Sequence, residues 1–142
     1  YDAEGRNFVR TMLRLAQTRD EIGVVADQLG CPTFAEDLAD ALIAIAKRTP
    51  TAAGLYHCAG AGETSWAGFA EEIFRLARAR GGPSARVIPI ASSAYPTPAP
   101  RPANSRLDCA KLAADYGVRM RPWQAALSAC IDAIAADGWR VE

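Results

Sequence analysis

Short runs of branched apolar residues alternate along this chain with longer segments in which apolar side chains recur every three or four positions. The short runs are too brief for helices and are predicted to be strands, at 22–26, 54–59 and 86–90. The longer segments are predicted to be helices, at 7–18, 34–48, 66–80, 108–116 and 122–136. Alternation of this kind predicts an α/β fold. Three short strands cannot cover so many apolar helix faces, so we expect a missing part upstream.

Residues at the segment ends support these boundaries. Asn7 is placed to cap the first helix, and Thr33 with Glu36 three residues later forms a capping-box pattern before the second. Pro122 suits the first turn of the last helix. Pro89 cannot donate to a strand ladder, so the third strand is expected at a sheet edge or strand end.

Composition limits the class of protein. The chain has 142 residues, 50% hydrophobic and 23% charged, as in an ordinary globular domain or a part of one. Sixteen basic and sixteen acidic side chains cancel, so no global field favours nucleic acid or an anionic membrane as partner. The longest apolar run, 41–46, is too short to cross a bilayer. The first residue is Tyr1 and no secretory signal is visible, so we expect a cytoplasmic fragment or processed product.

The cysteines and the histidine do not form a metal-ligand pattern. The four cysteines lie far apart, and the single histidine, His57, adjoins only one of them, so zinc is not indicated. We expect four reduced, mostly buried thiols. His57 lies within a predicted strand without a catalytic partner, so a hydrogen-bonded core or sheet-face role is favoured. Trp66 and Trp123, each in the first turn of a helix, are expected to be packing anchors.

A glycine-rich turn, 60–65 (GAGETS), stands between a predicted strand and a helix, as a dinucleotide-binding turn does. Ser65 replaces the third glycine, and no acid between 73 and 107 could hold a ribose. Two interpretations remain, a nucleotide fingerprint or a plain strand-to-helix turn capped by Thr64 or Ser65. We favour the plain turn.

A stiff basic segment follows the third strand and reads YPTPAPRPANSRLD over 95–108. Prolines alternate through its first half, and polar and cationic side chains follow them: Arg101, Asn104, Ser105 and Arg106. A guanidinium matches phosphate geometry with two parallel hydrogen bonds, and a rigid backbone loses less entropy on binding. We favour phosphate binding by this segment. The alternative is a loop that covers a sheet edge and whose arginines meet helix carboxylates.

Two further polar residues, Asp27 and Gln28, stand at the carboxyl end of the first predicted strand, where α/β proteins bind ligands. A turn-forming role for Asp27 is equally compatible with this position. No Ser-x-x-Lys, Cys/His pair or Tyr-x-x-x-Lys dyad occurs in the chain. From its residues alone, the chain is an α/β piece with a phosphate-accepting segment and no reaction centre of its own.

Five blocks carry a family resemblance: NFVRTMLRLA (7–16), VVADQLGCPT (24–33), GLYH (54–57), GETSW (62–66) and RPANSRLD (101–108). In this order they resemble the C-terminal half of dTDP-4-dehydrorhamnose reductases, which are extended short-chain dehydrogenase/reductases. The resemblance spans nearly the whole chain. It implies a Rossmann-like fold of which residues 1–142 would be the C-terminal, substrate-binding part, without the N-terminal cofactor-binding part.

The resemblance implies NADPH-dependent reduction of the 4-keto group of dTDP-4-dehydro-L-rhamnose, the last step toward dTDP-L-rhamnose for cell-surface polysaccharide. In the family, the cofactor fingerprint and the Tyr-x-x-x-Lys dyad precede the point that corresponds to Tyr1. The isolated chain is therefore expected to be inactive, with no catalytic residue. NADPH would be bound mainly by the missing half, and the family also allows Mg²⁺.

A dTDP-sugar is the ligand that the resemblance implies, and its diphosphate would account for Arg101 and Arg106. The expected substrate-binding residues are Asp27, Gln28, Thr33, Arg101, Asn104, Ser105 and Arg106. The expected protein partner is a second copy in a homodimer or a separately encoded N-terminal half. Two alternatives remain: a non-catalytic regulatory or binding subunit of the same fold, and a reductase or epimerase for another nucleotide sugar.

Overall fold

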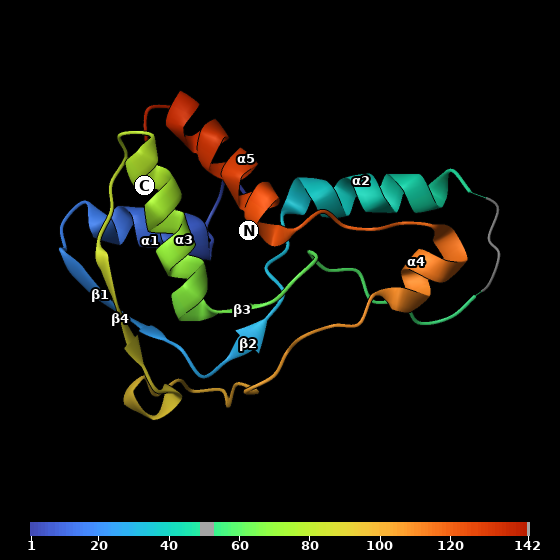
Figure 1. The fold of residues 1–142 in the computed structure, drawn as a ribbon, viewed down its shortest axis with the longest axis horizontal. Coiled ribbons are helices and arrows are strands. Elements are labelled where there is room, and N and C mark those ends of the chain that lie inside the picture. Colours follow the sequence, from blue (N-terminus) through green and yellow to red (C-terminus); the bar gives the residue numbers. More distant parts are fainter. Residues whose placement is uncertain (49–52, 142) are drawn as a thin grey trace.

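The computed structural model describes residues 1–48 and 53–141, and it is α/β as expected (Figure 1). Its α-helices are α1 (Phe8–Ala16), α2 (Ala35–Ala46), α3 (Trp66–Ala79), α4 (Ala110–Tyr116) and α5 (Trp123–Ala136). Its strands are β1 (Glu21–Val25), β2 (Leu29–Gly30), β3 (Thr64–Ser65) and β4 (Arg86–Ile90), and η1 (Ser92–Ala94) is a single 3₁₀ turn. Five helices and few short strands confirm the predicted fold class.

The larger strand pair joins β1 to β4 in parallel, from Glu21 opposite Arg86 to Val25 opposite Ile90. Helices α2 and α3 lie in the crossover between the two strands, and α3 packs against both (Figure 1). In the part of the chain that the structure describes, β4 pairs with β1 alone. Pro89 therefore lies on an edge strand, as predicted, because it removes a donor where no further strand needs one.

The smaller strand pair joins β2 to β3, antiparallel, with Leu29 opposite Ser65. On its other side, Leu29 forms an isolated parallel bridge with Asn104. Residues 95–108 are called the proline segment below. Three segments far apart in the sequence therefore lie side by side in a short ribbon: β3, β2 and the polar end of the proline segment. This ribbon lies between the compact body and α4 in Figure 1.

The hydrophobic core lies among α1, α3, α5 and the β1–β4 pair. The predicted inner face of α5 is buried along its whole length: Trp123, Ala126, Leu127, Cys130, Ile131 and Ile134. Helix α3 buries Phe69, Ala70, Ile73, Leu76 and Ala77 as predicted. The prediction for Trp66 is wrong, because its side chain remains 44% exposed at the start of α3.

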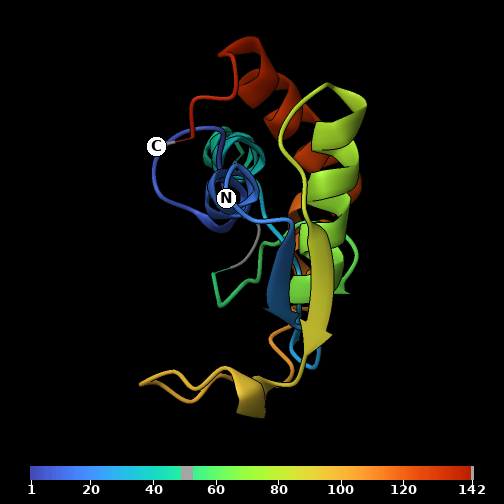
Figure 2. The same cartoon turned by 90° about the vertical axis from the view of Figure 1, so that its left-hand side faces the viewer.

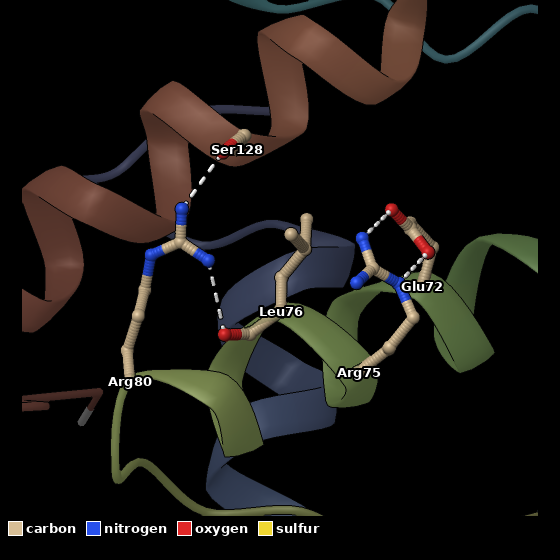
Figure 3. A network of polar contacts seen from close by, with 5 residues as sticks. All are labelled: Glu72, Arg75, Leu76, Arg80 and Ser128. Atoms are coloured by element: carbon tan, nitrogen blue, oxygen red, sulfur yellow. Dashed lines mark hydrogen bonds and ion pairs between the residues drawn. The ribbon is translucent and has the colours of Figure 1, made fainter.

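Arg80, at the C-terminal end of α3, links this helix to α5 by hydrogen bonds (Figure 3). Its guanidinium donates to the Ser128 hydroxyl at 2.7 Å, to the Leu76 carbonyl at 3.1 Å and to the Asp132 carboxylate at 2.6 Å. Its neighbour Arg75 instead pairs with Glu72 on the same helix. Arg80 therefore joins two helices, whereas Arg75 pairs within one.

Two local predictions are corrected. Residues 54–59 do not form a strand in the described part of the chain. Leu55 in this run is 80% exposed, and no strand of the described residues lies beside it to complete a ladder. The Thr33–Glu36 capping box does not form either, because α2 has Phe34 at its N-cap without a side-chain hydrogen bond.

Helix α2 extends away from the body beside α4 (Figure 1). Of its residues only Ala41 is buried, whereas Leu42 and Ile43 are 57% and 51% exposed. The predicted apolar stripe thus packs only in part. None of the helices in the described residues has the length and apolarity to span a bilayer.

The thiols and the histidine differ from expectation in burial. All four cysteines are free, but only Cys130 is buried, and the other three are partly exposed. His57 is exposed rather than part of a core or a sheet face, because the run that contains it is not a strand.

A candidate ligand cleft

A polar and aromatic cavity of about 400 Å³ lies where the three-segment ribbon meets α1 and α3. Hydroxyls of Thr33, Thr64, Ser65 and Ser105 line it together with the rings of Tyr1, Phe8, Trp66 and Phe69. We call it the inner cavity. Hydroxyl groups beside aromatic faces suit a ligand with both polar edges and apolar surfaces.

A larger cavity of about 900 Å³ adjoins the inner one. One of its walls comes from α1 and β1, and the other is residues 95–101 of the proline segment. We call it the outer cavity. Phe8, Gln28 and Trp66 line both cavities, so the two are adjacent, and we call them together the cleft.

Trp66 stands at the junction of the two cavities, and Phe8 packs against it with ring centroids 4.8 Å apart. The exposed part of the indole is available to a planar or apolar ligand group. The sequence analysis assigned Trp66 to the core. Its position directly after the polar pair Thr64 and Ser65 could have indicated a site, because an aromatic residue beside surface hydroxyls fits a binding wall.

Asp27 and Gln28 meet at Ser92, and Asp27 does not line the inner cavity. Asp27 accepts hydrogen bonds from the Ser92 backbone N–H at 3.0 Å and from the Ser92 hydroxyl at 2.5 Å. Gln28 donates from Nε2 to the same hydroxyl oxygen at 2.9 Å. The hydroxyl and backbone hydrogen bonds from Ser92 lower the pKa of Asp27 below its ordinary value, because they favour the charged carboxylate. Of the two residues, Gln28 also lines both cavities.

Thr33 and Ser105 line the inner cavity and have structural hydrogen bonds as well. The Thr33 hydroxyl donates to the Cys31 carbonyl at 3.0 Å and accepts from the Gly60 N–H at 3.0 Å. These bonds explain why Thr33 does not cap α2. The Ser105 hydroxyl and backbone N–H both donate to the Leu29 carbonyl, at 3.0 and 2.9 Å.

The structure does not bring Arg101 and Arg106 to one cavity. Arg101 lines the outer cavity. Arg106 lines a separate cavity of about 370 Å³ and pairs with Glu63 at 2.7 Å. Asn104 accepts from both the backbone N–H and Nε of Arg106, at 3.1 and 2.9 Å, and so orients that guanidinium. Arg106 thus meets a carboxylate of its own chain, as in the alternative interpretation of the segment, although Glu63 precedes β3 and does not lie on a helix.

The glycine-rich turn has the geometry of a plain turn. A side chain at Gly60 would place its Cβ 2.2 Å from the carbonyl oxygen of Pro32. The glycine is therefore required by the close approach of two backbone segments. Ser65 caps α3 by accepting from the Gly68 N–H at 3.1 Å. The turn therefore has the capped strand-to-helix geometry that the sequence analysis favoured.

Metal-ligating side chains do not gather in the described residues, where no group of three or more His, Cys, Asp or Glu could hold an ion. No residue of the described ranges is therefore assigned to Mg²⁺.

Solved structures with the same arrangement define the class. A dTDP-4-dehydrorhamnose reductase from Clostridium acetobutylicum superposes with a TM-score of 0.84 at 38% identity, over 93% of this chain and 45% of that one. The Bacillus anthracis reductase, solved in complex with NADP, gives 0.79 at 34% identity, over 90% of this chain and 43% of that one. The chain thus has the α/β fold of a part of a Rossmann-like extended short-chain reductase.

The family model of the RmlD substrate binding domain matches residues 1–136, and the chain belongs to this family. The dTDP-4-dehydrorhamnose reductase of Sinorhizobium fredii is 44% identical over 97% of this chain and 48% of its own length. That of Escherichia coli K12 is 43% identical over 87% of this chain and 43% of its own length. The chain spans about half the length of the curated relatives it matches. The resemblance noted in the sequence is confirmed.

Proposed function

We propose that this chain is the nucleotide-sugar-binding, C-terminal half of an NADPH-dependent dTDP-4-dehydrorhamnose reductase, which reduces the 4-keto group of a dTDP-bound deoxysugar in the cytoplasm. The observation that carries the proposal is the cleft with hydroxyls, Trp66 and the cations Arg19 and Arg101 along it, in a chain that the substrate-binding family matches over residues 1–136. Its combined size suits a ligand as long as a nucleoside diphosphate sugar.

The residues along the cleft suggest how such a ligand would be held. In the inner cavity, Thr33 and Ser105 present hydroxyls that can bind sugar oxygens, and the exposed indole of Trp66 can cover an apolar ring face. In the outer cavity, Arg101 presents a guanidinium to a diphosphate. Arg106 and Asn104 would act less directly, because they pair with each other and with Glu63 beside a different cavity.

We assign NADPH to a partner region outside residues 1–142, because the glycine-rich turn of this chain has Ser65 in place of a third glycine and uses it to cap α3. When bound, that cofactor would supply the hydride. The residues described above would bind and orient the sugar and exclude water. The chain by itself is then a binding half without turnover, and no step is derived through Mg²⁺.

Titration of the purified chain with dTDP-L-rhamnose tests the proposal. We expect saturable binding that weakens about tenfold in Arg101→Gln, since one charge-assisted bidentate contact is worth roughly 1.5 kcal/mol. Arg78→Gln is the matched control, because Arg78 lines a different surface on α3 and should leave affinity unchanged.

A second arm measures activity. A chimera in which this chain replaces the matching part of the Escherichia coli reductase should oxidise NADPH only when dTDP-4-dehydrorhamnose is present. Absence of both binding by the chain and activity in a folded chimera would overturn the proposed function. Binding without activity would favour the non-catalytic subunit instead.

A further inference from the structure

The chain is tied to the body at Ser92, just before the proline segment. Ser92 donates from its backbone and its hydroxyl to Asp27, and its hydroxyl accepts from Gln28. The 3₁₀ turn η1 continues this attachment, since the Tyr95 N–H donates to the Ser92 carbonyl at 3.0 Å. One side of the attachment is therefore the dipeptide Asp27–Gln28, which begins two residues after the end of β1.

The segment is tied again at Ala103 and Ser105, eleven and thirteen residues after Ser92, to Leu29, the residue that follows Gln28. Leu29 donates its N–H to the Ala103 carbonyl at 2.9 Å, and its carbonyl accepts from the N–H and hydroxyl of Ser105. Three consecutive residues, Asp27 to Leu29, therefore hold both ends of residues 93–102. We call residues 93–102 the proline loop and the two attachments its neck.

Beyond the neck, the proline loop projects from the foot of the molecule (Figure 2, gold to orange). Within residues 96–102, the Thr97 hydroxyl donates to the Ala99 carbonyl at 2.8 Å, a hydrogen bond that lies inside the loop and does not reach the body. Four of the loop's residues are proline, which restricts φ but fastens nothing to the body. The direction of the loop is therefore determined mainly at the neck.

We infer that Asp27 and Ser92 are positioning residues that hold the proline loop as a preformed wall of the outer cavity, so that Arg101 is placed for a nucleoside diphosphate before it binds. This inference rests on the proposed function for the nature of the ligand. It assigns Asp27 a role through Ser92 and the loop rather than a contact with the ligand. A loop held in its binding conformation loses less entropy when the ligand arrives, which strengthens binding.

The charge arrangement supports this assignment. The Asp27 carboxylate stays charged and accepts from two Ser92 donors, the backbone N–H, which both of its oxygens share, and the hydroxyl, so its charge is held at the neck. Asp27 is also absent from the residues that line the cleft, whereas Gln28, Ser92 and Arg101 line the outer cavity. An anionic ligand would therefore meet the cation of the loop and not the carboxylate that holds it.

Backbone ¹⁵N relaxation tests the neck without any ligand. The amides of Thr97, Ala99 and Arg101 should have order parameters near about 0.85 in the unaltered chain. In Asp27→Ala and in Ser92→Ala they should fall toward or below about 0.6, with amide shifts of α3 unchanged. Asp27→Asn retains an acceptor for the Ser92 N–H and should lie between these values. Ser84→Ala is the control, because it removes another serine hydroxyl that accepts from Arg78 away from the loop.

Titration with dTDP separates the claim that the neck orders the loop from the claim that the ordered loop strengthens nucleotide binding. We expect the dissociation constant to rise about tenfold in Asp27→Ala and less in Asp27→Asn. Unchanged order parameters in both alanine variants would overturn the inference, as would a loosened loop with unaltered dTDP affinity. If Asp27→Ala does not fold, the order parameters and the dTDP affinity of Ser92→Ala alone test the inference. If the unaltered chain binds no dTDP while the variants loosen the loop, the proposed function fails and the structural role of the neck stands.

Discussion

At the scale of single residues, burial separates side chains that look alike in the sequence. Cys130 is completely buried on the inner face of α5, while Cys31 is partly exposed and lines the inner cavity. Burial raises the pKa of the Cys130 thiol to about 12, because a thiolate is poorly solvated there. Thiolate is the reactive form, so burial and protonation act in the same direction.

The folded chain should therefore show selective thiol labelling. With iodoacetamide at pH 8, mass spectrometry should find Cys31 modified well before Cys130, by more than about tenfold in rate. In urea the difference should disappear. Equal rates in the folded chain would show that the environment of Cys130 is not as described.

Glycine positions allow a second test at this scale. Gly60→Ala forces a Cβ against the Pro32 carbonyl, a contact that neither backbone segment can relieve without moving. We expect a loss of about 1–3 kcal/mol in urea unfolding, the usual cost of overpacking. Gly23→Ala is the control, because its Cβ would meet the Ile90 side chain at an ordinary 3.6 Å. Similar losses for both would contradict the close approach at Gly60.

At the scale of secondary-structure elements, α3 connects the parts of the body. It packs against α1, α5 and both strands of the larger pair. The Arg80 side chain, which is 24% exposed, adds polar contacts to the apolar α3–α5 interface. Its ion pair with Asp132 lowers the pKa of that carboxyl, first through the hydrogen bond from Arg80.

Arg80→Ala should destabilise the chain by about 1 kcal/mol in urea unfolding at pH 7, the scale of a few partly exposed polar contacts. Arg75→Ala, which removes only a pair within one helix, should lower stability measurably less than Arg80→Ala does.

The stabilisation by the Arg80–Asp132 ion pair also depends on pH. Because the folded pKa of Asp132 is lowered, its stabilisation is present above the ordinary aspartate pKa and is lost as pH falls through the lowered value. Arg80→Ala should remove this part of the pH dependence. An identical acid profile in both proteins would exclude the contribution.

At the scale of the whole molecule, the cleft is assembled from segments that are distant in sequence. Phe8 comes from α1, Gln28 follows β1, Trp66 begins α3 and Arg101 lies on the proline loop. Unfolding would disperse all of them. A ligand that binds this cleft therefore binds the folded state alone and must raise its stability.

On the proposed function, dTDP-L-rhamnose at about 100 times its dissociation constant should stabilise the chain by about 2.7 kcal/mol, measured as a shift of the urea midpoint. The same concentration of rhamnose alone should have no comparable effect, because it lacks the diphosphate and the base. Equal shifts with both compounds would argue against recognition of the nucleotide.

Much of the fold follows from short-range pattern. Apolar spacing placed the helices of the described residues to within a few residues. Gln28, Thr33, Arg101 and Ser105, which were chosen from the sequence, line the cleft, and their part in binding a ligand stays a prediction. Their arrangement was not predictable, because the ribbon that carries Ser105 and the neck that holds Asp27 depend on pairing between remote segments.

The sequence by itself therefore determined the helices, the β1–β4 strands and the family, because helical period, caps and short sequence blocks are properties of neighbouring residues. Only the tertiary structure decided that Trp66 faces a cavity, that residues 54–59 do not form a strand, and that Arg101 and Arg106 line different cavities. Each of these outcomes depends on which distant segment lies alongside, and no local pattern contains that information.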